Sequence, residues 1–258
     1  MKRKLLQSFI LSLMLILTSL SGEDIKEGEL INLAGKQRML SQKMAKDYFY
    51  IAASSNKSNA DKQLEKSLVQ FIQAQKILKE KIKDKEILNL IYFVDMSLDE
   101  FKYIMKSKYT LDNRIILMDL SESILEGSDY IVKALSKNIK SNKIIDMAGK
   151  QRMLSQRIAK YYIAYQNGIK DNNTISQMKS SVDEFNKILQ KLKQNRSNTP
   201  EINRELADIS KLWDVVNQFY LNIKKGGLPK IVYLSTDKIT DKMDKVVGMY
   251  VKLLGKNK

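Results

Sequence analysis

The sequence contains no cysteine and no histidine, and its 258 residues include only two prolines. The lack of cysteine excludes a disulfide framework, so stability has to come from buried apolar surface and helix packing. Catalytic sites usually rely on histidine, cysteine, a glycine-rich phosphate loop or suitably spaced acids, and the chain has none of these patterns. We therefore expect no enzyme, no metal site and no cofactor.

Little in the chain interrupts helix formation, because the only prolines are Pro200 and Pro229 and the ten glycines are scattered. Core-facing positions recur every three or four residues, as on one face of a helix. One such stripe returns after 114 residues: Leu64, Leu68, Phe71, Gln75 and Leu78, then Met178, Val182, Phe185, Leu189 and Leu192. Thr199, followed by Pro200, is typical of a helix start.

Two further stripes are paired in the same way. Residues 87–105 correspond to residues 202–220 at a shift of 115. A last stripe runs from Leu120 to Ala134 and corresponds to one from Ile239 to Leu253, a shift of 119. We attribute the longer last shift to an insertion at residues 225–229. Four stripes in each half predict an all-α fold, with two tandem antiparallel four-helix bundle units from an internal duplication.

The N-terminus reads as a secretory signal peptide. Lys2, Arg3 and Lys4 precede an apolar run and then small residues that end at Ser21. An uncleaved membrane anchor is the alternative, although the run is short for a membrane span. We expect residues 1–21 to be the signal peptide, 22–138 and 139–258 the two helical repeats, and the location to be periplasmic. The polar junction 136–143 lacks glycine and proline, so it leaves open whether the helix ends there.

The chain is strongly basic, with a formal charge of +16 that falls to +13 if Lys2, Arg3 and Lys4 leave with the signal peptide. Export argues against a nucleic-acid partner and leaves anionic envelope surfaces and small anions. The lysines also fit a simpler role, in which they only solvate helix faces.

The most informative feature is a segment that occurs twice. Residues 31–46 read INLAGKQRMLSQKMAK and residues 145–160 read IDMAGKQRMLSQRIAK, with twelve of sixteen positions identical. The shift of 114 residues is the size of a small domain, which indicates that a whole unit was duplicated. Because the polar residues QR and SQ persist in both copies, the segment predicts a function beyond packing.

On a helical wheel, Arg38 and Arg152 lie toward the apolar, small-residue face of their helices, whereas Lys36, Lys43 and Lys46 lie on a side that we expect to be solvated. A buried arginine needs an acidic partner or a ligand, and its planar donors suit an oxyanion. In the alternative, both arginines pair with acids elsewhere in the bundle, such as Asp95 or Asp208, and Gly35 and Gly149 only ease packing.

The motif AGKQRMLSQ, present in both copies, closely resembles the opening of the PilJ-like domain, the N-terminal sensory domain of type IV pilus chemotaxis transducers. It is also similar to the helix-one box of nitrate and nitrite sensor kinases of the NarX and NarQ type. By this resemblance the two arginines would bind nitrate or nitrite. The candidate ligand-binding residues are Gly35, Gln37, Arg38, Ser41 and Gln42, with Gly149, Gln151, Arg152, Ser155 and Gln156.

Two arrangements of these helices remain open. The motif helices of one chain can pack about a pseudo-twofold axis and enclose one anion, or the bundles can stack end to end and complete their sites with a homodimer partner. The family members compared are transmembrane receptors with kinase or methyl-accepting output, and no such segment occurs here. We expect a soluble periplasmic sensory protein that acts with a separate membrane receptor. The alternative is a basic structural or interaction protein of the envelope or pilus system, without a small-molecule ligand.

Overall fold

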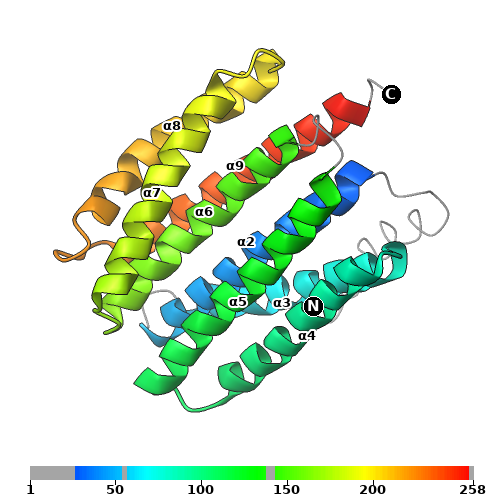
Figure 1. The fold of residues 1–258 in the computed structure, drawn as a ribbon. Helices are drawn as coiled ribbons and strands as arrows, with labels where there is room; N and C mark the ends of the chain where they lie inside the picture. Colours follow the sequence, from blue (N-terminus) through cyan, green and yellow to red (C-terminus); the bar gives the residue numbers. More distant parts are fainter. Residues whose placement is uncertain (1–26, 54–56, 138–142, 256–258) are drawn as a thin grey trace, which may run out of the picture.

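The computed structural model describes residues 27–53, 57–137 and 143–255, and in these residues the chain forms helices and no strand (Figure 1). The predicted signal peptide and the centre of the junction at 136–143 lie outside the described residues. The helices are α2 (Glu27–Ala52), α3 (Lys57–Lys81), α4 (Lys85–Lys106), α5 (Leu111–Ser136), α6 (Lys143–Gln166), α7 (Asn172–Lys193), α8 (Pro200–Leu221) and α9 (Pro229–Gly255).

Side-chain caps fix several of the helix starts. The Asp84 carboxylate accepts from the backbone N–H of Ile87 at 3.0 Å at the start of α4. The Thr199 hydroxyl accepts from the N–H of Ile202 at 3.3 Å, with Pro200 at the first helical position of α8. Such caps satisfy donors that have no partner within the helix. The predicted helix start at Thr199 is thereby confirmed.

The helices form two antiparallel four-helix bundles that lie side by side, α2–α5 and α6–α9 (Figure 1). The two motif helices, α2 and α6, run in the same direction and pack against each other between the bundles. Helix α2 also packs on α3 and α5, and α6 packs on α7 and α9. The predicted all-α pair of bundles is confirmed, and of the two open arrangements the side-by-side one is found.

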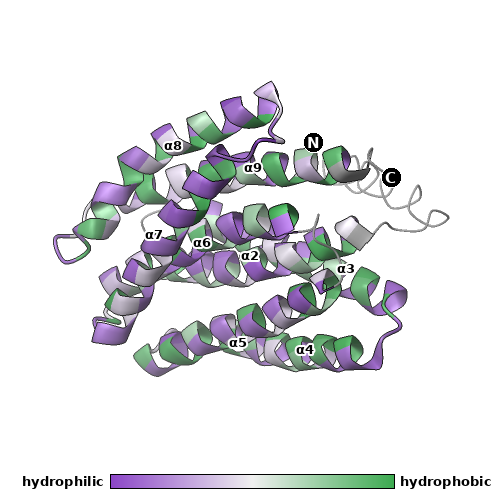
Figure 2. Ribbon diagram, turned by 45° about the horizontal axis from the view of Figure 1, so that its top comes forward, coloured by the Kyte–Doolittle hydropathy of each residue, from purple (hydrophilic) through white to green (hydrophobic). Residues whose placement is uncertain are grey.

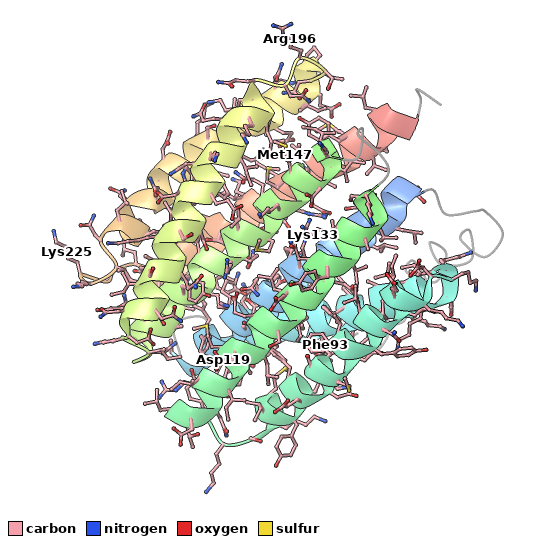
Figure 3. All side chains as sticks on the ribbon, viewed as in Figure 1. Phe93, Asp119, Lys133, Met147, Arg196 and Lys225 are labelled. Carbon is pink, nitrogen blue, oxygen red and sulfur yellow. The ribbon has the colours of Figure 1, made fainter. Side chains whose placement is uncertain are left out.

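Buried apolar residues of both bundles form one continuous core, and side chains fill the space between the helices (Figure 3). Each helix carries hydrophobic and hydrophilic residues (Figure 2), and the predicted stripes are largely buried. Phe71 and Phe101 are fully buried in the first bundle, and Phe185 stacks on Trp213 in the second at a ring separation of 3.9 Å. Ala134, predicted to end a core stripe, is exposed.

The register predicted for the last helices is wrong by one turn. Arg38 pairs with Asp129 on α5, and the equivalent Arg152 pairs with Asp244 on α9, so equivalent residues of α5 and α9 are 115 apart. A shift of 119 differs from 115 by four residues, about one helical turn, and such an error keeps the apolar stripe on the same face. The expected insertion at residues 225–229 is therefore not needed.

None of the described helices combines the length and hydropathy of a membrane span.

Candidate site at the pseudo-twofold axis

The two motif helices meet at a pair of glycines. A Cβ atom built on Gly35 would lie 3.4 Å from Nη2 of Arg38 and 3.6 Å from Nη2 of Arg152, and a Cβ on Gly149 would meet the same two atoms at the same distances. The two Nη2 atoms are therefore at most 3.4 + 3.6 = 7.0 Å apart. The structure thus brings both predicted arginines and both predicted glycines together at the pseudo-twofold axis between the bundles.

Each guanidinium has one partner in its own bundle and one across the interface. Arg38 donates from Nη1 to Asp129 on α5 and from Nη2 to Asp146 on α6, both at 2.7 Å. Arg152 donates from Nη1 to Asp244 on α9 and from Nη2 to Oδ1 of Asn32 on α2, the latter at 2.9 Å. Asp146 and Asn32 occupy equivalent positions of the two motif copies, so the arrangement is symmetric except for this exchange of carboxylate for amide.

The expected partners Asp95 and Asp208 are not the ones used. Asp95 pairs with Lys79 and Asp208 with Lys242, both away from the arginines. The idea that acids satisfy the arginines is correct, but the acids come from α5, α6 and α9.

The arginine side chains are only 2% and 1% exposed, whereas the carboxylates of Asp129, Asp146 and Asp244 are 26%, 35% and 50% exposed. The Nε atoms of both arginines are buried and have no hydrogen-bond partner among the described residues. Burial lowers the pKa of Arg152, with Asp244 opposing the shift and Arg38 adding repulsion. The centre is therefore a buried pair of like charges held by carboxylates that reach solvent.

The predicted glutamines and serines lie close in sequence but bond elsewhere. The amides of Gln37 and Gln151 point into their own bundles, where Gln37 donates to Gln75 and Gln151 donates to the carbonyl of Phe185 at 3.0 Å. The Ser41 hydroxyl donates to the carbonyl of Arg38 at 2.9 Å, and Ser155 bonds Arg152 in the same way at 2.8 Å. These side chains hold the helical turns that carry the arginines, and none of these hydrogen bonds goes to a guanidinium group.

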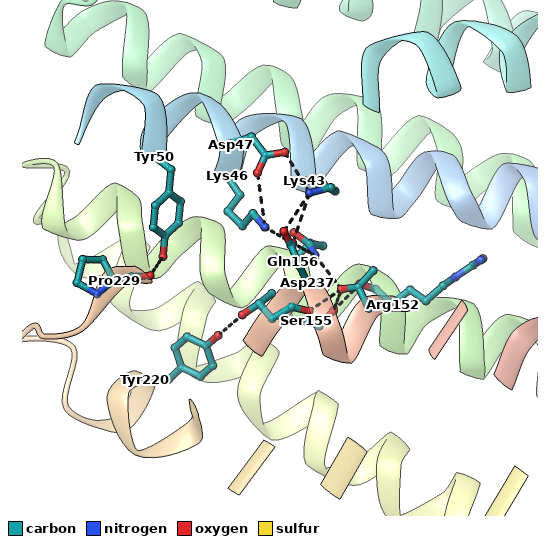
Figure 4. Close-up of polar contacts among 12 residues, drawn as sticks. Lys43, Lys46, Asp47, Tyr50, Arg152, Ser155, Gln156, Tyr220, Pro229 and Asp237 are labelled. Atoms are coloured by element: carbon teal, nitrogen blue, oxygen red, sulfur yellow. Dashed lines mark hydrogen bonds and ion pairs between the residues drawn. The ribbon is translucent and has the colours of Figure 1, made fainter. Parts of the chain in front are cut away.

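Gln42 and Gln156 bond to the last helix of their own bundle. The Gln42 amide donates to the Ser121 carbonyl at 2.9 Å, and the Gln156 amide donates to Asp237 at 3.0 Å and to Thr240 at 2.8 Å. Figure 4 shows Gln156 beside Asp237, one layer away from Arg152. Of the ten predicted residues, the structure gathers the arginines and glycines at one place and spreads the other six around it.

A second charged layer, missed in the sequence, crosses the interface. Lys46 on α2 pairs with Asp237 on α9 of the other bundle, and Lys160 on α6 pairs with Glu122 on α5 (Figure 4 draws the first of these). Both lysines are completely buried. Lys43 and Lys46 were expected to be solvated, and this is wrong for both, because the polar side of α2 faces α9: Lys46 is fully buried and the Lys43 side chain is only 12% exposed. The identical Ala-Lys end of both motif copies was the available signal.

A neighbouring cation shares each of these carboxylates. Arg157 lies 2.6 Å from Glu122, and the equivalent Lys43 lies 3.4 Å from Asp237. Burial opposes ionisation of Glu122, but Lys160 and Arg157 outweigh it and hold the pKa of this carboxyl at about 2. Burial lowers the pKa of Lys160 to about 8. Glu122 opposes this shift, and repulsion from Arg157 adds to it.

One feature of this layer is confined to the first motif. Asp47 is fully buried, and its carboxylate lies 3.2 Å from Lys43 and 3.5 Å from Lys46 (Figure 4). Its equivalent in the second motif is Tyr161. Burial raises the pKa of Asp47, against the pull of both lysines.

The described residues contain no group of three or more histidine, cysteine or acidic side chains that could hold a metal ion. No curated protein and no solved structure matches the chain. The family model for the type IV pili methyl-accepting chemotaxis transducer N-terminal region matches residues 24–86 and 134–244, which is 63 + 111 = 174 of 258 residues. Each matched segment contains one copy of the AGKQRMLSQ motif. The chain therefore belongs to the PilJ family of chemotaxis-related sensory domains.

Proposed function

We propose that the protein is a periplasmic sensory protein that binds one small oxyanion, such as nitrate or nitrite, between Arg38 and Arg152, and that it acts with a separate membrane receptor. The observation that carries this proposal is the meeting of two buried guanidinium groups between two glycines. Like charges at this separation repel, and an anion shared by both would relieve that repulsion.

The surroundings of the two arginines support replacement of their carboxylate partners by a bound anion. The carboxylates that hold the arginines are partly exposed, so they can turn to water when an anion takes their place. A planar oxyanion can accept from the donor forks of both arginines at once. Because Gly35 and Gly149 have no side chains, no Cβ atom from these two positions stands against the two Nη2 atoms.

The second candidate function is an interaction protein of the envelope or pilus system without a small ligand. The observation in its favour is that acids already satisfy both arginines. In that case removal of either arginine would only destabilise the protein, because the carboxylates that hold it, two for Arg38 and one for Arg152, lose their cation.

Substitutions of Gly35 and Gly149 distinguish these two functions better than substitutions of the arginines do. Thermal unfolding of the protein is measured with nitrate, nitrite, sulfate and chloride at matched ionic strength. We expect nitrate or nitrite to raise the midpoint by mass action, and Arg38→Ala and Arg152→Ala to abolish the rise. Gly35→Ala and Gly149→Ala should also abolish it without loss of baseline stability, since alanine favours a helix by about 0.8–1.0 kcal/mol over glycine.

Gly248→Ala provides the matched control, because a Cβ at Gly248 would meet no atom within 4 Å. It should leave the response to nitrate unchanged. If no oxyanion raises the midpoint, or if the response survives in the Gly35→Ala and Gly149→Ala variants, the proposed site is wrong and the interaction role is preferred.

A further inference from the structure

A separate cavity lies where the first bundle meets the last helix of the second. It has a volume of about 290 Å³, is open to solvent and is lined by side chains of α2, α3, α6 and α9, of which Lys66 and Asp241 are exposed. Lys43, Gln156 and Asp237, drawn in Figure 4, belong to its wall. Ligand pockets usually span roughly 300–1,000 Å³, so this one suits a small molecule.

The side chains that line the cavity include positively and negatively charged groups, and three of them have no close partner of opposite charge. Lys36 and Lys66 stand on the side of α2 and α3, and Asp241 stands on α9. Among the described residues, none of these three side chains has an opposite charge within 4 Å, whereas Asp244 and Asp237 in the same wall are engaged by Arg152 and Lys46. Burial lowers the pKa of Lys36 and raises that of Asp241, as expected for charges that lack a close counterion.

In the second bundle, the lysine at this position has an acidic partner. Lys150, the equivalent of Lys36, pairs with Glu184 on α7 at 2.5 Å. The residue equivalent to Glu184 is Gln70 on α3, which lines the cavity and offers no carboxylate. Ser180 stands at the position equivalent to Lys66. The first bundle therefore differs from its own copy by one lost acid and one gained base, both beside the cavity.

We infer that this cavity binds a small zwitterion of the size of an amino acid, with its carboxylate toward Lys36 and Lys66 and its ammonium toward Asp241. A plain anion would face the carboxylates of Asp241 and Asp244, and a plain cation would face the two lysines. Only a ligand with both charges compensates both sides of the wall. The amide and hydroxyl groups of Gln63, Gln70, Ser67 and Thr240 supply neutral donors and acceptors for the rest of the molecule.

The test is isothermal titration calorimetry of the intact protein with the standard L-amino acids, and with acetate and ethylammonium as probes of one charge each. We expect at least one amino acid to bind and both single-charge probes to bind at least tenfold more weakly. Lys36→Gln and Asp241→Asn should each weaken amino-acid binding at least tenfold. Both side chains reach solvent, so these variants should fold.

Lys150→Gln is the matched control, because it removes the equivalent lysine on the second bundle and should leave amino-acid binding unchanged. Binding of acetate as tight as that of any amino acid would make the cavity an anion site and overturn the inference. Absence of amino-acid binding would do the same, as would binding that both Lys36→Gln and Asp241→Asn leave intact. These results do not depend on nitrate, so the inference stands or falls separately from the oxyanion site.

Discussion

The two bundles keep the same cations at their interface and differ in the groups that neutralise them. Arg38 and Arg152 have equivalent positions, but across the interface the first meets Asp146 and the second meets Asn32. Lys46 has Asp47 as well as Asp237 nearby, while Lys160 depends on Glu122. The comparison teaches that the basic residues and their partners on α5 and α9 are the fixed part of this interface, and that the divergence lies in two acids of the motif helices, Asp146 against Asn32 and Asp47 against Tyr161.

The largest difference in stability between the two halves should follow removal of Glu122 or Asp237, the carboxylates that pair with a lysine of the other bundle. Glu122→Ala leaves Lys160 buried without an acid, and we expect a loss of about 3–5 kcal/mol in unfolding free energy. Asp237→Ala should lose clearly less, because Asp47 lies 3.5 Å from Lys46 and can replace the missing charge. Urea unfolding at pH 7 measures both variants. Equal losses would show that Asp47 does not compensate.

Lowering the pH should reveal the contribution of the Glu122 carboxylate to stability. The pKa of Glu122 is about 2 in the folded protein against an ordinary value of 4.5, so the unfolded chain binds more protons between these values. Stability should therefore be full above pH 4.5 and fall as the pH drops toward 2, with Glu122 contributing on the order of 3 kcal/mol. Urea unfolding at several pH values measures this slope. In Glu122→Gln the slope should be shallower, and an unchanged slope would contradict the assigned pair.

A smaller effect is expected from making the arginine surroundings symmetric. Asp146→Asn copies the Asn32 side and removes the carboxylate that competes for Arg38, so nitrate should bind about tenfold more tightly, equivalent to ~1.4 kcal/mol. Asn32→Asp copies the other side and should weaken binding by a similar factor. Titration calorimetry measures both, and shifts in the same direction would disprove competition by these residues.

The smallest effect concerns the hydrogen bond between α2 and α3 in the first bundle. Gln75 accepts from Gln37 and donates to the carbonyl of Ile91 at 2.8 Å, whereas its equivalent is the buried Leu189. Gln75→Leu should change stability by less than about 1 kcal/mol, because Gln37 can donate to the Phe71 carbonyl as Gln151 does to Phe185. Thermal unfolding measures this change. A loss of several kcal/mol would show that the glutamine pair is essential to the first bundle.

Much of the fold was predictable because apolar spacing determines which face of each helix is buried. The stripes through Phe71 and Phe185 follow from this spacing, and the helix start at Thr199 follows from its capping hydroxyl and the proline after it. The position of one helix along another is different, since a slip of one turn preserves the stripe. The register of α9, and with it the pairing of Arg152 with Asp244, was therefore out of reach of the periodicity.

The candidate site was predictable in its repeated residues and not in their partners. The inward direction of Arg38 and Arg152 follows from their place on the wheel, and their meeting follows from the pseudo-twofold packing. Burial of Lys46 and Lys160 did not follow, because a polar helix face looks the same whether it meets water or a second bundle. Only the placement of both bundles identifies Asp237 and Glu122 as their partners.

Because α2 and α6 belong to one chain, both arginines of the central pair are joined covalently. In a site divided between two identical subunits, dilution would separate the halves, and every substitution would appear twice. Here each half is held at a fixed effective concentration near the other, whatever the abundance of the protein. A change can also enter one half alone, as with Asp146 and Asn32. The duplicated chain can thus tune its response one side at a time.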